Sequence, residues 1–197
     1  MHLLGKAFIF PEKGYDAYVT LNFTQVDPLH SFTLCLKSFT NLIQDYTLFS
    51  YSTQYHDRDI SIYKTYMHGH PTFIVSIGGE KAHFRVPDSY LGWKSSCVTW
   101  SSETGALTLG MGGYVLARKV VLKGYSVGPN PRVTLGDVYW RTYWKSAFGG
   151  EIKDVYMWND IIPMKDLKTT AWDFLSPSPI INWRNLTYEM YGNVTLI

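Results

Sequence analysis

Apolar and polar residues alternate along most of the chain, which is the pattern of β-strands that bury one face. The first alternating run covers 17–23. The pattern returns at 32–37, 46–52, 59–66, 72–78, 97–101, 106–109, 114–121, 132–135 and 154–158. Turn signals separate the runs, among them Gly78-Gly79 and Gly112-Gly113. Many short strands joined by such turns predict an all-β fold, a two-sheet antiparallel jelly-roll sandwich.

One segment has the spacing of a helix instead of a strand. Pro163 suits the first position of a helix. Met164, Leu167 and Ala171 follow at intervals of three and four residues, and Pro177 ends any helix that began there. The sequence therefore predicts one short helix on the surface of the sandwich.

Size and composition narrow the class of protein. The chain has 197 residues, of which 46% are hydrophobic and 16% aromatic, so it is folded and long enough for a single domain over residues 1–197. The net charge is +2, and the Lys and Arg residues are scattered. That distribution offers no stripe for nucleic acid and no basic patch for a membrane surface. No apolar run approaches the roughly 20 residues that span a bilayer, so no membrane span is expected.

Two cysteines, Cys35 and Cys97, stand in strand-like runs far apart in the sequence. Their positions suggest one disulfide across the sandwich. Such a bridge closes a loop whose chain-entropy effect on stability is about 4 kcal/mol. The alternative is a pair of buried free thiols, which is the expectation for a cytosolic chain. The pattern alone leaves both interpretations open.

The run from Cys97 to Ser102 resembles the signature of the pentraxin family. In that signature a histidine stands two residues before the cysteine, and Ser/Thr, Trp and Ser/Thr follow it. Here Thr99, Trp100 and Ser101 match, whereas Ser95 replaces the histidine. Further segments follow in family order: Gly5-Lys6-Ala7-Phe8-Ile9-Phe10-Pro11, 31–35, 48–51, Lys123-Gly124-Tyr125, 150–158 and Asn182-Trp183. The resemblance is to the short secreted pentraxins and covers nearly the whole chain.

The resemblance implies a fold, an assembly and an activity. The implied fold is a jelly-roll sandwich with one long helix on one face and a bridge between Cys35 and Cys97. The implied protein is secreted to the extracellular space, assembles as a homopentamer and serves innate immunity. Its implied activity is calcium-dependent binding of phospholipid head groups or glycans on microbial or cell surfaces, with two calcium ions per subunit.

The implied calcium positions are altered in this sequence. The family's Asp-Asn pair falls on Asp57 and Arg58, with Asp59 beside them, so that arginine replaces asparagine. A later Glu-Gln-Asp run falls on 138–140, after Asp137, and supplies none of those three residue types. Calcium needs about 6–8 oxygen ligands, and a guanidinium close to the ion repels it. We therefore expect calcium to bind weakly or not at all.

The resemblance also implies a ligand pocket beside the calcium positions. Tyr63 matches one of the tyrosines that line it, and Ser76 stands where a second tyrosine is found. Tyr139 and Trp140 occupy the altered loop and could stack on a sugar or another planar ligand. The alternative is that these two aromatic residues pack against the sandwich.

Three glycosylation triplets begin at Asn22, Asn185 and Asn193 and favour an extracellular protein. Residues 1–6 are too short for the basic and apolar regions of a secretory signal. A leader is therefore expected to have been removed from, or to be missing in, this version of the chain.

Two other interpretations remain open besides a recognition protein. One is a degenerate family member that binds no ligand, in keeping with the altered calcium positions. The other is a jelly-roll glycoside hydrolase, which would use two carboxylates about 5–9 Å apart. Glu103, Glu151 and Asp154 are the available acids, and nothing in their spacing pairs them. Since the sequence also contains no recognisable Ser/His/Asp arrangement, we expect no enzyme.

Overall fold

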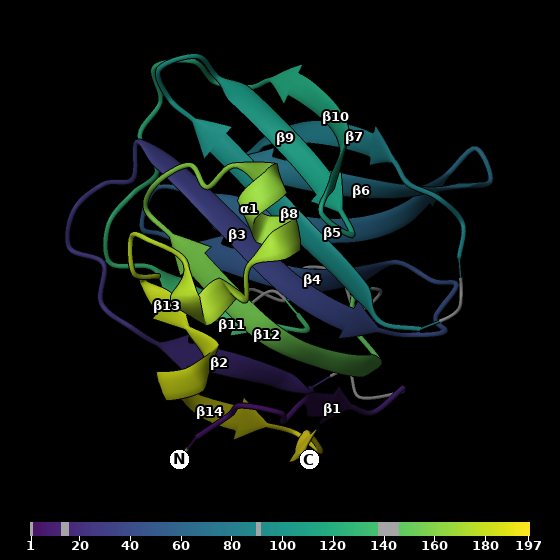
Figure 1. The fold of residues 1–197 in the computed structure, drawn as a ribbon. Helices are drawn as coiled ribbons and strands as arrows, with labels where there is room; N and C mark the ends of the chain where they lie inside the picture. The colour runs from purple at the N-terminus through teal and green to yellow at the C-terminus, as the bar shows by residue number, and fades with distance from the viewer. Residues whose placement is uncertain (1, 13–15, 90–91, 138–145) are drawn as a thin grey trace.

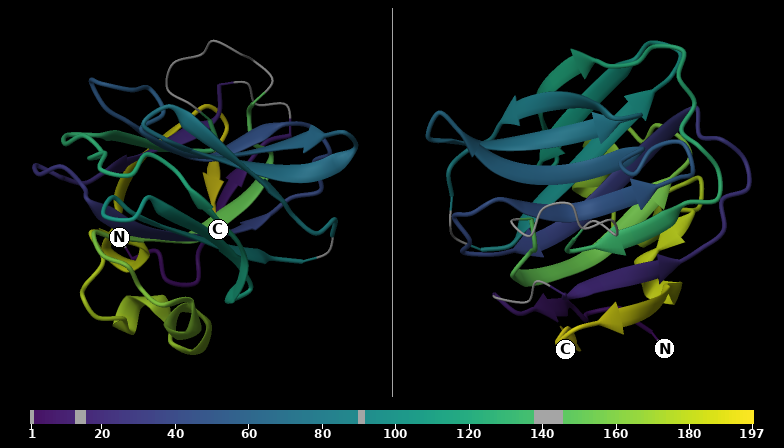
Figure 2. Two further views of the ribbon diagram at one scale, coloured as in Figure 1. Left: turned by 90° about the horizontal axis from the view of Figure 1, so that it is seen from above. Right: turned by 180° about the vertical axis from the view of Figure 1, so that it is seen from behind.

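The computed structural model describes residues 2–12, 16–89, 92–137 and 146–197 of the chain. Within these ranges the strands form two antiparallel sheets that pack face to face, and a helical segment lies on one outer surface (Figures 1 and 2). The predicted two-sheet jelly-roll sandwich with one short helix is confirmed.

The two sheets are named here by their strands. Sheet A has the order β10 (Tyr114–Val120), β9 (Ala106–Met111), β8 (Lys94–Ser101), β3 (Ser31–Phe39), β12 (Gly150–Trp158), β1 (Phe8–Phe10), β15 (Thr195–Leu196), and β13 (Ile181–Asn182) also pairs with β12. Sheet B has the order β14 (Thr187–Tyr191), β2 (Tyr18–Asn22), β11 (Arg132–Leu135), β4 (Tyr46–Ser52), β5 (Ile60–Met67), β6 (His70–Ile77), β7 (Glu80–Arg85).

The core lies between the sheets because successive side chains of a strand point to opposite faces. On β3, Phe32, Leu34 and Leu36 are fully buried on the inner face. Phe32 stands opposite Trp100 of β8, and the centroids of their rings are 6.1 Å apart. Thr33 and Cys35 therefore point outward, away from sheet B.

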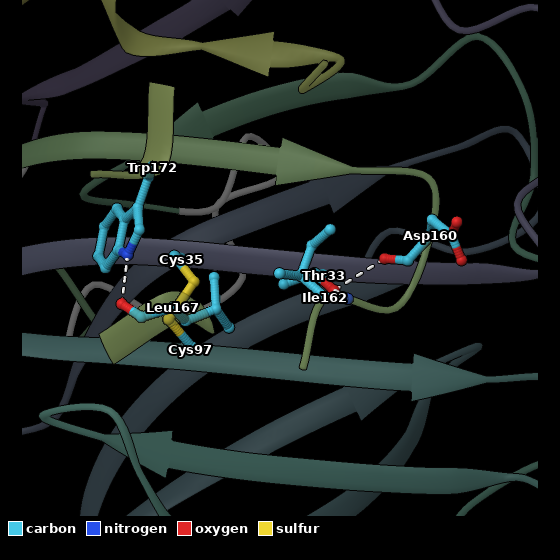
Figure 3. The surroundings of a disulfide bond; sticks show 7 residues. All are labelled: Thr33, Cys35, Cys97, Asp160, Ile162, Leu167 and Trp172. Atoms are coloured by element: carbon cyan, nitrogen blue, oxygen red, sulfur yellow. Dashed lines mark hydrogen bonds between the residues drawn. A yellow bond between two sulfur atoms is a disulfide. The ribbon is translucent and has the colours of Figure 1, made fainter. Parts of the chain in front are cut away.

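The disulfide between Cys35 and Cys97 forms as the resemblance implied, but it does not cross the sandwich. The two cysteines stand directly opposite each other on the neighbouring strands β3 and β8, with Cα atoms 4.2 Å apart. The expectation of a bridge between the sheets is wrong, because both cysteines occupy outward positions of one sheet. Figure 3 shows the bridge on the outer face of sheet A, beside Leu167 and Trp172.

The helical segment covers this outer face. It contains α1 (Met164–Thr169) and η1 (Trp172–Phe174), whereas η2 (Trp183–Asn185) follows β13 further along the chain. The indole N–H of Trp172 donates to the carbonyl of Leu167 at 2.9 Å, and its ring packs edge-on against Tyr156 of β12. The helix is short, as the residues predict, and not long, as the resemblance implies. It begins at Met164, so Pro163 is the residue before the first turn and not its first member.

The alternating pattern did not predict all strands. β1, β7, β13, β14 and β15 were absent from the predicted runs. On β14 four of the five residues are exposed, so no buried face marks the strand in the sequence. β1, β13 and β15 have three or two residues, which is too short for a periodic signal. None of the helices in the described part of the chain has the length and apolar character needed to cross a membrane.

Candidate functional site

Three of the predicted site residues meet on the outer face of sheet B, the side of the sandwich opposite the helix. Arg58 lies in the turn between β4 and β5, Tyr63 lies on β5, and Ser76 lies on β6. All three line one cavity of about 280 Å³. The other described residues that line it are Ser61, Ile74, Lys81 and Ser146. The structure thus brings together three positions from one turn and two neighbouring strands, and their role in ligand binding stays a prediction.

Strand register explains why these side chains gather. Ser61 of β5 stands opposite Ser50 of β4 on one side and Ser76 of β6 on the other. Ser76 in turn stands opposite Lys81 of β7. Residues directly opposite each other on paired strands share a face, so the three serines form a row that ends at Lys81. The neighbouring positions Ile60 and Ile62 fill the core, which turns this row outward.

Ser61 is the most unusual member of the row. Its side chain is only 1% exposed, and its hydroxyl has no hydrogen-bond partner among the described residues. Buried polar groups are nearly always paired, so each exception needs an explanation. Because Ser61 lines the cavity, a bound ligand can supply the missing partner.

Tyr63 is held in place from the side of β4. Its hydroxyl donates to a carboxylate oxygen of Asp45 at 2.7 Å. Burial, followed by the hydrogen bond and charge of Asp45, raises the pKa of Tyr63, while the positive charge of Arg58 acts in the opposite direction. Tyr63 therefore stays a neutral phenol at physiological pH, and its orientation is fixed.

Asp59 has a different role from the one its sequence position suggests. It is fully buried, and its carboxylate accepts three hydrogen bonds. One oxygen accepts from the hydroxyl of Thr53 at 2.8 Å and the backbone N–H of Gly128 at 2.9 Å. The other accepts from the hydroxyl of Tyr125 at 2.6 Å. These bonds fasten the turn before β5 to the segment that leads into β11, and they occupy three of the roughly four lone-pair sites of the carboxylate.

The other two carboxylates among the predicted metal positions are Asp57 and Asp137. Asp57 is exposed, and its backbone carbonyl accepts from the hydroxyl of Ser52. Asp137 is buried after β11, and one of its carboxylate oxygens accepts from the hydroxyl of Ser146 at 3.3 Å. Neither is among the described residues that line the cavity.

These residues do not fit a calcium site of the implied kind. The described ranges contain no group of three or more His, Cys, Asp or Glu side chains placed to hold a metal ion. The carboxylate of Asp59 is already used, and Arg58 brings a positive charge to the cavity. A calcium ion prefers about 6–8 oxygen ligands.

Some predicted residues cannot be placed. Tyr139 and Trp140 lie outside the residues that the structure describes. The asparagines of the three triplets, Asn22, Asn185 and Asn193, are all exposed, and their modification stays a prediction. Sequence reasoning missed Ser61 and Lys81. The alternation on β5 could have assigned Ser61 to the outer face, but only the pairing of four strands puts it in line with Lys81.

Comparison with known proteins gives consistent matches over nearly the whole chain. A family model described as the Pentaxin family matches residues 6–197. Mucosal pentraxin from Bos taurus is 38% identical over 198 residues, which cover 98% of this chain and 88% of that protein. C-reactive protein from Sus scrofa is 33% identical over 197 residues, covering 98% of this chain and 86% of that protein.

A solved structure agrees in fold. The heptameric SAP-like pentraxin from Limulus polyphemus superposes with a TM-score of 0.80, covering 97% of this chain and 94% of that chain. The two sequences are 14% identical, so this likeness concerns the fold alone.

Proposed function

Because the chain belongs to the pentraxin family, we propose that it is a recognition protein that binds phosphorylated head groups on the outer face of sheet B, with little or no dependence on calcium. Glycans are the second ligand class that the family implies. The cavity has a volume of about 280 Å³, near the lower end of the roughly 300–1,000 Å³ typical of small-molecule pockets, which favours a compact head group.

One observation carries the calcium part of this proposal. The carboxylate of Asp59 is closed off by three internal donors, while Arg58 lines the cavity in place of an oxygen donor. A divalent cation 4 Å from the guanidinium of Arg58 would be repelled by about 8 kcal/mol in a partly exposed site, twice the value for two single charges. Among the described residues, these features give little support to a calcium ion at the cavity, which favours binding that does not depend on calcium.

The proposal is tested by binding to phosphoethanolamine beads in calcium and in EDTA, together with calorimetric titration of calcium into the protein. We expect equal retention in both buffers and no calcium binding in the micromolar range. Retention in calcium alone contradicts the proposal. Failure to bind in either buffer supports the degenerate, non-binding interpretation instead.

We further propose that the protein works outside the cell. The bond between Cys35 and Cys97 fits an oxidising compartment, and the exposed Asn22, Asn185 and Asn193 are accessible to glycosylation. Mass spectrometry of protein expressed with a secretory leader in animal cells tests this. Glycans on at least one triplet are expected, and a fully unmodified, retained chain contradicts it.

Assembly into a homopentamer is the family-based proposal for the quaternary structure. Five binding faces on one particle would raise the avidity for a repetitive surface without any new contact. Light scattering after size exclusion tests this, with a mass close to five times 22.6 kDa expected. A monomer at micromolar concentration contradicts the assembly but leaves the binding face untouched.

The proposal does not include catalysis. The related proteins named above are recognition proteins by family. Of the three acids considered for hydrolysis, Asp154 forms an ion pair with Lys37 at 2.8 Å on the outer face of sheet A. A hydrolase activity would appear as the release of reducing sugar from polysaccharides, and none is expected.

A further inference from the structure

The charged side chains that line the cavity on sheet B are positive, as in a site that binds anions. Arg58 and Lys81 both line it, and none of its described lining residues is acidic. The two ion pairs recorded in the described ranges are Lys37–Asp154 and Arg184–Asp173, so neither uses these two cations. The carboxylate of Asp45 accepts a hydrogen bond from the Tyr63 hydroxyl at 2.7 Å and keeps its negative charge, but Asp45 is not among the described residues that line the cavity.

The hydroxyl of Ser61 is the second independent observation. It is buried, belongs to a residue that lines the cavity, and lacks a hydrogen-bond partner among the described residues. Ser61 stands opposite Ser76, which in turn stands opposite Lys81. A hydroxyl in this state donates readily to an oxyanion. Its desolvation has already occurred on folding, so the new hydrogen bond is gained without a further loss of bonds to water.

The combination fits a phosphate group better than a carboxylate or a sugar. A guanidinium donates two parallel hydrogen bonds to phosphate oxygens, and an ammonium supplies a compact point charge. Ser61 supplies a third kind of donor from below. Beside these groups Tyr63 and Ile74 offer a flat, mainly apolar wall for the organic part of a head group.

We propose that Arg58 and Lys81 hold the phosphate of the ligand directly, with the Ser61 hydroxyl as a third donor, so that the two side chains replace the double positive charge of a calcium ion. This inference rests on the function proposed above and assigns the ligand's charged group to named residues. Binding is therefore independent of calcium and weakens as salt screens the two cations.

The test compares variants in EDTA with three probes: inorganic phosphate, soluble O-phosphoethanolamine, and vesicles that contain phosphatidylethanolamine. Arg58→Gln and Lys81→Gln each remove one positive charge from the cavity. Lys165→Gln on α1 removes the same charge from the opposite side of the molecule, where the side chain is exposed, and is the matched control. Ser61→Ala removes only the hydroxyl.

Arg58→Gln and Lys81→Gln are expected to weaken O-phosphoethanolamine binding by roughly tenfold to a hundredfold each, since a hydrogen bond to a charged group contributes about 1.5–3 kcal/mol. Ser61→Ala is expected to weaken it by about fivefold, since the hydroxyl is neutral. Lys165→Gln is expected to bind as the unmodified protein does. Near-ultraviolet circular dichroism of each variant establishes that the fold is retained.

The outcomes separate this inference from the function on which it rests. If the unmodified protein binds in EDTA and both charge variants bind equally well, the inference is overturned while the proposed function stands. If the unmodified protein binds none of the probes, or binds them in calcium only, both are overturned. Binding of vesicles but not of the soluble probes, with the same loss in both charge variants, supports the inference and assigns the phosphate to a lipid surface.

Discussion

Asp57 and Asp59 stand two residues apart in the turn before β5, but their surroundings are opposite. Asp57 is exposed to solvent, whereas Asp59 is fully buried and accepts three hydrogen bonds through its carboxylate. A buried carboxylate with three donors acts as a structural anchor. The turn that carries Arg58 is therefore fixed from behind, which holds the guanidinium at the cavity.

Asp59→Ala is expected to lower the free energy of unfolding by about 3 kcal/mol or more, because it leaves buried donors without an acceptor. The donors affected belong to Thr53, Tyr125 and Gly128. Asp57→Ala is the matched control and should change the free energy by no more than about 0.5 kcal/mol. Urea unfolding followed by circular dichroism measures both. Equal effects of the two substitutions would contradict the anchoring role.

At the scale of elements, the two outer faces of the sandwich are used differently. Sheet A carries α1 and the disulfide on its outer face, so that face is packed (Figures 1 and 3). Sheet B carries the row of serines and the cavity. This difference arises from the side chains on the two outer faces. Sheet A has Cys35, Tyr156 and Trp158 at outward positions, whereas sheet B has Ser61 and Ser76.

The disulfide is expected to stabilise the whole molecule by restricting the unfolded chain. Replacing both Cys35 and Cys97 by alanine opens a loop of sequence separation 62 and should lower the free energy of unfolding by about 4 kcal/mol, within the range of 2–5 kcal/mol for native bridges. Amide hydrogen exchange should therefore show a similar loss of protection for the slowest amides of both sheets, because these exchange only through global unfolding. A loss confined to β3 and β8 would contradict this mechanism.

The contact between α1 and the β9–β10 turn can be tested with two adjacent glycines. Both have positive φ, but a Cβ added to Gly113 would lie 2.4 Å from the Cβ of Lys168 and 2.9 Å from its Cα, whereas one added to Gly112 meets nothing within 4 Å. Gly113→Ala should therefore cost at least about 1 kcal/mol more than Gly112→Ala, which suffers only backbone strain. Thermal unfolding of both variants measures the difference. If the two variants unfold at the same temperature, α1 does not pack against this turn.

At the scale of the whole molecule, the sequence predicts the layers better than it predicts neighbours. The bounds predicted for β4 and β11 match those of the structure. Alternation could not predict that β3 and β8 are neighbours in one sheet, so the disulfide was wrongly expected to join the two sheets. Periodicity fixes which face a side chain points to, while sheet order depends on contacts far apart in the chain.

The same limit applies to the candidate site. Arg58, Tyr63 and Ser76 were identified through resemblance and lie around one cavity. Ser61 and Lys81 were not identified, because their relation to these residues arises from the register of β4, β5, β6 and β7. Local sequence carries no signal for such a row, since single serines on strands are common.

Buried tyrosines in both sheets make the stability of the whole molecule sensitive to alkaline pH. Burial, and then the charges of Asp173 and Asp154, raises the pKa of Tyr156 in sheet A to about 12. Burial, and then Tyr66, also raises the pKa of Tyr46 in sheet B. In the unfolded chain a tyrosine titrates near pH 10. Their contribution to stability is thus complete below about pH 10, where both states keep the proton, and is lost as the pH rises toward the folded-state pKa.

The free energy of unfolding is therefore expected to fall steeply between about pH 10 and pH 12, because the unfolded chain releases protons that the folded chain retains. Tyr46→Phe and Tyr156→Phe each remove one of these titrating groups and should make the decline shallower. Tyr55→Phe, at an exposed position, is the control and should leave the slope unchanged. Urea unfolding at several pH values gives the slope, and absorbance at alkaline pH follows tyrosine ionisation. If all variants decline in parallel, the loss of stability comes from other groups and burial of these two rings does not control it.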